Sequence, residues 1–399
     1  MVGIQIFFWV LRSVSALETL GLDINFWPVG IQYFGAEMGY GAVAKQDIEK
    51  GTPSMIIPID LVINSADPFP LSPYLNHLAS EALLAYRLLW DRFSESPAKQ
   101  FSKKWTEILP KEYNVLSIWN TTERSWMDEY SLKFLEYNHS FKPYEEFLKA
   151  KSSIEKLDWV PQELLDYRWF QWGYAAVLSR TWSYPAAYIK QARGEEVKPE
   201  DFAIRTTGMY PVAENVNHCT VPSKHRKPSI QLSMTMKDKW AAVMAQTNFK
   251  KGQEFCIEYD EDPNNGMLFK YGFVVEKNYL EEFFIEKKTK NCNEKVIEGG
   301  ICQWALKSYE LNPRLLEYLS KGKGKEEGLK SYISEVKNIL KNSKYSIREL
   351  RRKNSAAEML REKFAITYGV GQRLLLQEHV KFAMRDLLKN YSEKLKLIN

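Results

Sequence analysis

The stretch MYPVAENVNH, residues 209–218, and the stretch GQEFCIEYDEDPNNGMLFKYGF, residues 252–273, decide the fold of this chain. Taken alone, an Asn-His pair is more typical of a hydrogen-bonded turn than of a binding site. A Tyr-Gly-Phe run is likewise more typical of a protein core. Their order and spacing favour a single site that is assembled from short strands and tight turns.

A glycine-rich turn precedes both stretches. Residues 39–44 read GYGAVA, close to the G-x-G-x-x-G pattern of dinucleotide sites, and Asp60 follows about 20 residues later. Residues 45–50 are too few for the crossover helix of a parallel βαβ unit, so the context excludes a dinucleotide fold. The glycines instead leave main-chain N–H and C=O groups that a ligand can approach closely.

Strand and helix patterns alternate along the chain in blocks. Residues 28–64 combine apolar–polar alternation with β-branched residues, which predicts short strands. Apolar residues at helical spacing fill residues 72–160, and this block reads as a helical insertion. Strands are expected again within residues 211–273, and a helical pattern continues from about Asn278 onwards.

In order along the chain, the motifs resemble those of the SET-domain methyltransferases. The helical insertion and the helical C-terminal region are similar to the branch typified by the Rubisco large-subunit lysine methyltransferase. The resemblance covers roughly residues 25 to 390 and rests on these elements: Gly39-Tyr40-Gly41, Trp105-x-x-x-Leu109-Pro110 followed by Trp119, Ser179-Arg180, Pro-x-Ala-Glu-x-x-Asn-His at residues 211–218, Gly-x-Glu at 252–254, Tyr259, Asn-x-x-x-Leu at 264–268 and Tyr-Gly-Phe at 271–273.

The resemblance implies an α+β fold with a defined division of the chain. Residues 28–278 are expected to form the SET-domain β-fold, in which a C-terminal segment threads through a loop, an exception to the rule that chains avoid knots. The helical insertion lies at about 72–160, and residues 279–399 are expected to form an all-α domain. Residues 1–27 read as an N-terminal amphipathic helix, with a targeting segment as the alternative.

The resemblance also implies S-adenosylmethionine (AdoMet) as the methyl donor and no metal. A guanidinium suits a donor carboxylate because it can form two parallel hydrogen bonds. The implied donor site contains main-chain groups of Met38, Gly39 and Tyr40 at the methionine end, Arg180 at the carboxylate, Glu214 with Asn217 and His218 at the turn that holds the ammonium and adenine, and Tyr271, Gly272 and Phe273 closing the pocket.

Catalysis in such a site requires an uncharged lysine amine facing the sulfonium methyl group. Free lysine has a pKa of ~10.4, and a narrow, dry channel lowers that pKa because it disfavours the ammonium form. By the resemblance, Tyr259 is the catalytic tyrosine, whose hydroxyl orients the amine or the departing methyl. The resemblance also implies that Trp182 lies in the substrate channel, and a large aromatic residue at this place resembles the members that methylate lysine rather than histidine.

Three residues depart from the family pattern. Glu214 stands where the family usually has Asp, Asp260 follows the catalytic tyrosine where Gly is usual, and Met38 precedes the Gly-x-Gly turn where an acidic residue is common. Two functions therefore stay open. The first is methylation of lysine on a non-histone protein, and the second is a catalytically degenerate SET-fold protein that serves as a binding or scaffold subunit.

The positive charge of the chain is concentrated in one late segment. The 399 residues contain 55 Lys or Arg and 50 Asp or Glu, an excess too small to indicate general nucleic-acid binding. From Lys321 to Lys353, 11 basic residues stand against 4 acidic ones. This segment is either a solvated helical face or a docking surface for an acidic protein or RNA. The resemblance implies that the C-terminal domain holds the protein substrate.

The four cysteines, Cys219, Cys256, Cys292 and Cys302, are widely spaced and form no C-x-x-C pair. In a chain of this size, reduced thiols in an intracellular compartment are expected. The cytosol is the first expectation and the mitochondrial matrix the alternative. No apolar stretch approaches the ~20 residues of a transmembrane helix.

Overall fold

The structure, a computed structural model, describes residues 27–396 except 36–37, 96–99, 128–142, 220–229, 236–238, 260–261, 277, 279, 290–291, 298–300 and 308–309. The expected N-terminal helix therefore lies outside the described residues, apart from Trp27, and so does Asp260. The chain forms two compact units. Described residues up to Ile118, from 143 to 219 and from 230 to 259 belong to the first unit, and Trp119–Met127 and the residues from Asp262 onwards belong to the second.

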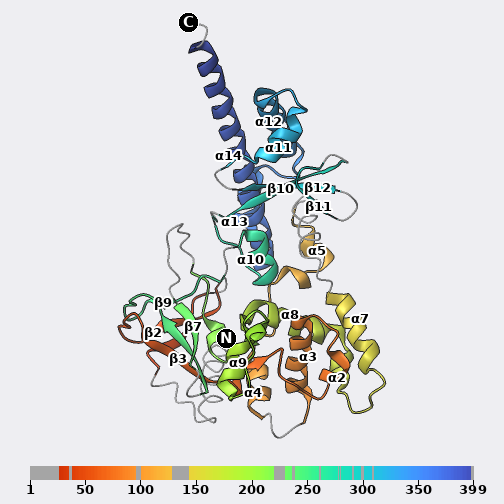
Figure 1. The fold of residues 1–399 in the computed structure, drawn as a ribbon, viewed down its shortest axis with the longest axis vertical. Coiled ribbons are helices and arrows are strands. Elements are labelled where there is room, and N and C mark those ends of the chain that lie inside the picture. The colour runs from red at the N-terminus through yellow and green to blue at the C-terminus, as the bar shows by residue number, and fades with distance from the viewer. Residues whose placement is uncertain are drawn as a thin grey trace. The chain divides into compact units, whose positions relative to one another are not determined.

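The described residues of the first unit form three small antiparallel sheets, and strands from two of them, β2 with β9 and β3 with β7, are labelled in Figure 1. Strand β2, which follows the glycine-rich turn, pairs antiparallel with both of its neighbours and is therefore not part of a parallel βαβ unit. The strand orders are β1 (Val29–Tyr33)–β2 (Tyr40–Ala44)–β9 (Glu254–Phe255), β3 (Pro53–Pro58)–β8 (Trp240–Ala245)–β7 (Ile230–Thr235) and β4 (Ile63–Asn64)–β6 (Arg205–Met209)–β5 (Trp182–Pro185).

Helices in the same unit bury their apolar faces against one another. Helices α3 (Ser80–Phe93) and α8 (Tyr167–Arg180) pack together, and the rings of Tyr86 and Phe170 lie 5.1 Å apart at their contact. The other helices of its described residues are α2 (Ser72–Leu75), α4 (Gln100–Ile108), α7 (Pro143–Ile154), α9 (Ala186–Arg193) and the 3₁₀ turns η2 (Ile59–Leu61), η4 (Leu116–Ile118), η5 (Gln162–Leu165), η6 (Pro199–Phe202) and η7 (Ala213–Asn215).

The second unit is not all-α, which corrects the expectation for residues 279–399. It contains an antiparallel sheet of order β10 (Glu282–Lys288)–β12 (Ile301–Lys307)–β11 (Lys295–Ile297). Phe283 and Ile285, two positions apart on β10, are both buried, because alternate residues of a strand point to the same face of the sheet. Its helices are α5 (Thr121–Arg124), α10 (Asn264–Lys270), α11 (Pro313–Ser320), α12 (Lys325–Asn342), α13 (Ile347–Ala356) and α14 (Leu360–Lys396), and α14 runs beside α12 and α13 (Figure 1).

One ion pair within the second unit joins distant parts of the sequence. Asn120 and Glu123 form a capping box that begins α5. The buried Glu123 carboxylate then accepts a hydrogen bond from Arg361 Nη1 at 2.6 Å. The two residues are 238 positions apart in the sequence. Helix α5 is thereby attached to the start of α14, although it comes from the middle of the helical insertion.

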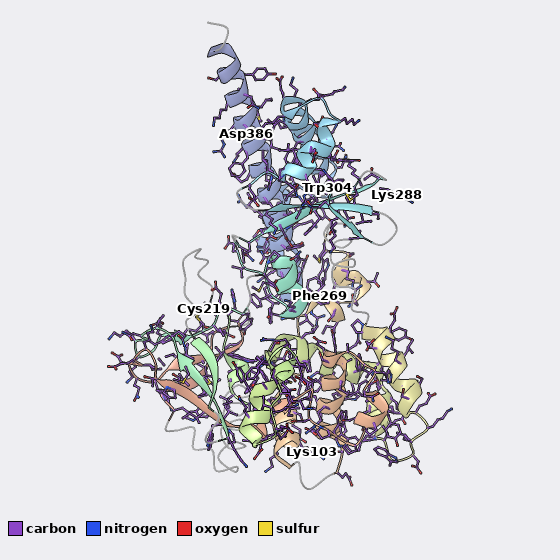
Figure 2. All side chains as sticks on the ribbon, in the orientation of Figure 1. Lys103, Cys219, Phe269, Lys288, Trp304 and Asp386 are labelled. Atoms are coloured by element: carbon purple, nitrogen blue, oxygen red, sulfur yellow. A yellow bond between two sulfur atoms is a disulfide. The ribbon has the colours of Figure 1, made fainter. Side chains whose placement is uncertain are left out.

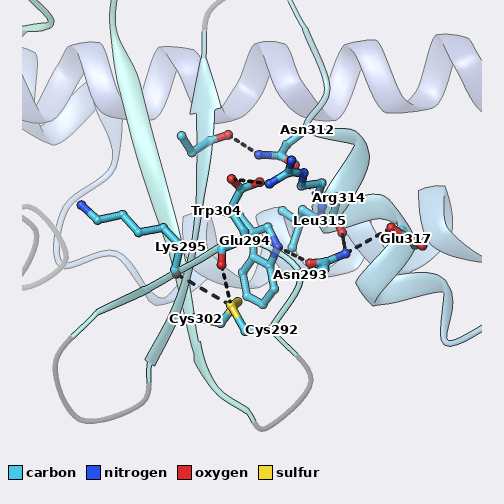
Figure 3. Close-up of polar contacts among 11 residues, drawn as sticks. Cys292, Asn293, Glu294, Lys295, Cys302, Trp304, Asn312, Arg314, Leu315 and Glu317 are labelled. Carbon is cyan, nitrogen blue, oxygen red and sulfur yellow. Dashed lines mark hydrogen bonds and ion pairs between the residues drawn. A yellow bond between two sulfur atoms is a disulfide. The ribbon is translucent and has the colours of Figure 1, made fainter.

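The cysteines form two disulfides, which corrects the expectation of reduced thiols. Cys219 pairs with Cys256 at a Cα–Cα distance of 5.1 Å, and Cys292 pairs with Cys302 at 5.4 Å. The first pair is brought together by an isolated parallel bridge between His218 and Ile257, a contact that residue spacing does not reveal. In the second pair, Cys302 lies on β12 beside Trp304, whose indole donates to Asn293 Oδ1 at 3.0 Å (Figure 3).

Both units together confirm the predicted α+β class. Among the helices of the described residues, none is long and apolar enough to cross a membrane.

Candidate functional site

The motif at residues 209–218 forms a tight, mostly buried turn between β6 and the first disulfide. Val212 has a φ of 72°, which is unusual for a β-branched residue and marks a backbone held by its surroundings. Its carbonyl accepts hydrogen bonds from Asn215 N at 3.0 Å and Asn215 Nδ2 at 3.3 Å. We call residues 212–218 the central turn, because the other site residues of the first unit gather around it.

Arg180 reaches the central turn from the last position of α8. Its Nη1 donates to the Glu214 main-chain oxygen at 3.3 Å and to Asn215 Oδ1 at 3.4 Å. Its guanidinium lies 5.8 Å from the centroid of the Tyr113 ring. Its Nε is buried, and no described residue accepts a hydrogen bond from it. Arg180 Nε can therefore donate a hydrogen bond to a further acceptor at the edge of this turn.

Glu214 points into the helical part of the first unit. Its Oε1 accepts the Trp105 indole N–H at 3.1 Å and Asn215 Nδ2 at 3.2 Å. Burial raises the pKa of Glu214 to about 7, because the nearby Arg180 charge and these hydrogen bonds only partly offset the loss of water. Glu214 is longer than the Asp usual in the family pattern, and its contact with Trp105 on helix α4 accommodates the extra length.

Asn217 and His218 pair with the segment that leads to Tyr259. Ile257 N donates to the Asn217 main-chain oxygen at 2.9 Å, and Cys219 N donates to the Ile257 oxygen at 2.9 Å. The Asn217 side chain donates to Glu254 Oε1 at 3.1 Å. The central turn is therefore held to this segment by main-chain and side-chain hydrogen bonds.

The glycine-rich turn approaches the central turn closely. A Cβ atom on Gly41 would collide with Asn217 Nδ2 and the Phe34 ring, so a larger residue there would displace these side chains. Gly39 has a φ of 67°, and a Cβ built on it would meet nothing within 4 Å, so its backbone borders open space. Met38 precedes it, and Tyr40 begins β2 with its ring 5.3 Å from that of Tyr33. Burial raises the pKa of Tyr40.

Tyr259 is fastened to the central turn at two points. Its hydroxyl donates to the Val216 main-chain oxygen at 2.7 Å, and its amide donates to His218 Nδ1 at 3.2 Å. The two rings meet edge to face, with centroids 5.5 Å apart. Burial lowers the pKa of His218 to about 4, so the imidazole is neutral near pH 7 and can accept this hydrogen bond.

The remaining predicted residues lie on two other elements. Trp182 begins β5 in the first unit, with its ring 6.4 Å from that of Tyr210. Tyr271 and Gly272 follow α10 in the second unit, and both amides donate to the Met267 oxygen. Phe273 lies with its ring 6.2 Å from that of Tyr271.

Sequence reasoning missed several residues that support the site. Trp105 and Glu254 belong to the motifs Trp-x-x-x-Leu-Pro and Gly-x-Glu. These motifs are the sequence signal from which their contacts with the central turn could have been predicted. Tyr113 and the Val216 carbonyl carried no such signal. Within the described ranges, no group of three or more His, Cys, Asp and Glu residues is arranged to hold a metal ion.

The arrangement of strands, insertion and C-terminal helices matches that of known structures. The SET domain of LSMT bound to lysine and AdoHcy aligns with a TM-score of 0.68 over 96% of this chain and 92% of that chain, at 17% sequence identity. The chain has the SET-domain fold. Rubisco LSMT bound to AdoMet aligns over the same shares with a TM-score of 0.67 at 17% identity, so the structural likeness includes the C-terminal helices.

A third LSMT complex, with methyllysine and AdoHcy, aligns with this chain over the same shares, with a TM-score of 0.68 at 18% identity. No protein-family model and no curated protein matches the sequence. The SET-domain fold predicted from the ordered motifs is thus confirmed by structural likeness alone.

Proposed function

We propose that this chain is an AdoMet-dependent protein-lysine N-methyltransferase that acts on a non-histone protein. The observation that carries the proposal is that the central turn contacts both Arg180 and Tyr259. A carboxylate-binding guanidinium and a catalytic hydroxyl are thereby held by one rigid backbone segment. Such fixed geometry is what methyl transfer needs, because the rate depends on alignment of donor and acceptor.

The residues present fit AdoMet. Arg180 Nε is buried and has no acceptor among the described residues, and the two bonds from Nη1 are long for a charged donor. A donor carboxylate at this guanidinium would satisfy the buried Nε. We assign the backbone of Met38, Gly39 and Tyr40 to the methionine end, because the open space at Gly39 allows close approach. Glu214, Asn217, His218, Tyr271, Gly272 and Phe273 complete the proposed donor-binding set.

Each catalytic role follows from the environment of the residue. AdoMet, when bound, supplies an electrophilic methyl group on a sulfonium. The Tyr259 hydroxyl and the Val216 carbonyl provide adjacent polar groups that can orient an uncharged amine. Neutral His218 fixes the Tyr259 backbone without placing a positive charge near the sulfonium. Trp182 is assigned to the lysine channel, where an aromatic wall excludes water and favours the neutral amine.

A second candidate function is a scaffold that keeps the fold without turnover. The observation that favours it concerns Glu214, which stands where the family usually has the shorter Asp. Its carboxylate accepts hydrogen bonds from Trp105 and Asn215. Thermal unfolding with and without AdoMet separates the two candidates, because a ligand that binds the folded state raises the Tm. An enzyme should show a Tm rise and methyl incorporation into an extract. A Tm rise without incorporation favours the scaffold, and no Tm change at millimolar AdoMet counts against the proposed enzyme.

The proposed protein-binding surface is the basic segment from Lys321 to Lys353, on α12 and α13. All eleven basic side chains of this segment are exposed. Lys325 and Lys330 form ion pairs and the Arg352 charge acts on the Glu349 carboxylate, whereas Arg348 and Arg351 on α13 form no ion pair with any described residue. We infer that this surface holds an acidic stretch of the protein substrate, because unpaired arginines favour carboxylate partners.

Charge reversal tests this surface. The triple variant Arg348→Glu, Arg351→Glu and Arg352→Glu should raise the KM for extract proteins and leave AdoMet affinity unchanged. The double variant Arg385→Glu and Lys389→Glu on α14 is the matched control. Loss of the effect after ribonuclease treatment of the extract would assign the surface to RNA, and equal KM values for the two variants would remove it from substrate binding.

A further inference from the structure

The disulfide Cys219–Cys256 lies close to the site in both of the segments that it joins. Cys219 directly follows His218, and Cys256 directly precedes Ile257, which leads to Tyr259 (Figure 2 labels Cys219). The Cα–Cα distance of 5.1 Å lies within the range that a disulfide can bridge. The covalent bond therefore joins the donor-binding turn to the segment that carries the catalytic tyrosine.

The main-chain pairing between the same two segments involves few residues. His218 and Ile257 form an isolated parallel bridge with two main-chain hydrogen bonds, Ile257 N to the Asn217 oxygen and Cys219 N to the Ile257 oxygen. The two Tyr259 contacts, to Val216 and His218, depend on the register of this bridge. A shift of one residue would move the tyrosine hydroxyl away from the central turn, because successive side chains of an extended segment point to opposite faces.

We propose that the Cys219–Cys256 pair is a redox modification site that controls the methyl-transfer site, a proposal that rests on the function proposed above. The reactant class is a dithiol reductant. One reductant thiolate attacks a cystine sulfur and forms a mixed disulfide, and the second reductant thiolate then displaces the protein sulfur. The protein S–S bond is replaced by two thiols, and the reductant gives up two electrons and two protons and becomes a disulfide.

Exposure decides which sulfur is attacked. Cys256 is partly exposed, whereas Cys219 is 5% exposed. Attack is therefore expected at Cys256, with Cys219 as the leaving thiolate. After reduction, no covalent bond holds the register of Tyr259 against the central turn, which then depends on the short bridge and on the hydrogen bonds of Asn217 and Tyr259. We expect weaker AdoMet binding and slower methyl transfer in the reduced protein.

The second disulfide provides a matched control. Cys292–Cys302 belongs to the other unit, where Cys302 is fully buried on β12 and Cys292 lies near the main-chain oxygens of Glu294 and Lys295 (Figure 3). None of the residues proposed for donor binding or catalysis adjoins this pair in the sequence. Its removal should leave redox control of the methyl-transfer site intact.

The experiment compares the oxidised full-length protein with the same protein after dithiothreitol treatment. Calorimetry measures the AdoMet Kd, methyl incorporation measures turnover, and hydrogen exchange measures protection of the Cys219, Ile257 and Tyr259 amides. In the wild type, reduction should raise the Kd and lower turnover several-fold, decrease protection at those amides, and be reversed by oxidised glutathione. Alkylation mapping verifies which disulfide has opened, so the wild-type comparison does not require any variant to fold.

The variants sharpen the result. Cys219→Ser with Cys256→Ser should resemble the reduced wild type and lose the response to dithiothreitol, whereas Cys292→Ser with Cys302→Ser should keep the response. Unchanged Kd, turnover and amide protection after verified opening of Cys219–Cys256 would overturn the redox proposal and leave the methyltransferase proposal standing. A change in protection at the three amides, with no AdoMet binding in either redox state, would support redox control of the turn and contradict the methyltransferase proposal.

Discussion

The hydroxyl of Tyr259 lies 2.7 Å from the main-chain oxygen of Val216, so the tyrosine side chain is anchored to a buried backbone carbonyl. The same residue donates its amide to His218. These two contacts fix both ends of the tyrosine and leave its ring edge-on to the imidazole. A substitution that keeps the ring and removes the hydroxyl therefore separates packing from chemistry.

Tyr259→Phe should lower the rate of methyl incorporation by at least an order of magnitude while the AdoMet Kd changes little. The hydroxyl is expected to act on the amine and methyl in the transition state more than on the bound donor. The lost hydrogen bond should destabilise the fold by about 1 kcal/mol. Tyr271→Phe is the comparison, with a milder expected effect. Equal incorporation by wild type and Tyr259→Phe would exclude this hydroxyl from the mechanism.

Arg180→Ala should weaken AdoMet binding by an order of magnitude or more, because a hydrogen bond to a charged group contributes about 1.5–3 kcal/mol. Isothermal calorimetry measures the change. Arg168→Ala is the matched control, since Arg168 lies on the same helix with its side chain 87% exposed and paired to Asp166. Similar affinities for the two variants would show that the guanidinium of Arg180 does not contact the donor.

Trp105→Phe should destabilise the first unit by about 1–3 kcal/mol, because the buried Glu214 carboxyl loses its indole donor. The pKa of Glu214 should rise further, since this hydrogen bond favours the charged form. Urea unfolding measures the loss of stability. Trp159→Phe, at a site 46% exposed, should have a much smaller effect. A Trp105→Phe protein as stable as the Trp159→Phe protein would contradict the structural role of this contact.

Glu281→Gln should change how stability depends on pH. Burial raises the pKa of Glu281 from 4.5 to about 8, although Asn264 and Gln372 donate hydrogen bonds to its carboxyl. The folded protein therefore keeps a proton that the unfolded chain has lost between these pH values. The stabilisation from this group is fully present below about pH 4.5 and is lost as the pH rises through about 8.

The difference in unfolding free energy between wild type and Glu281→Gln should thus shift in favour of the variant as the pH rises. Urea titrations at several pH values measure it. Glu378→Gln, on the exposed side of α14, should follow the wild type at every pH. Parallel curves for wild type and Glu281→Gln would mean that Glu281 titrates near its ordinary pKa.

The sequence was sufficient for the fold class and for the order of the site motifs, because both depend on short local patterns. The strands around Gly41 and the turn before His218 have their own turn residues and alternation. The sheet β10–β12–β11 was missed because its short alternating strands lie among long helical patterns and charged residues. The residue roles in the donor site were carried over from a resemblance and stay predictions.

Contacts between distant residues were beyond sequence reasoning. Trp105 and Glu214 are 109 positions apart, and no local pattern links an indole on α4 to a carboxyl on the central turn. The pairing of Cys219 with Cys256 likewise depends on a bridge that forms only when the strands between them have folded. The sequence spacing of the cysteines therefore indicated free thiols.

The ion pair between Glu123 and Arg361 has a consequence for how the protein is made. A ribosome releases α5 long before it synthesises α14, because 238 residues separate the two partners. During that interval the Glu123 carboxylate has no Arg361, and closing so long a loop carries an entropic cost. Contacts of high sequence separation also form slowly. The second unit can therefore be completed only after α14 has been synthesised, and a nascent chain stalled before α14 would expose the α5 side chains that later contact it.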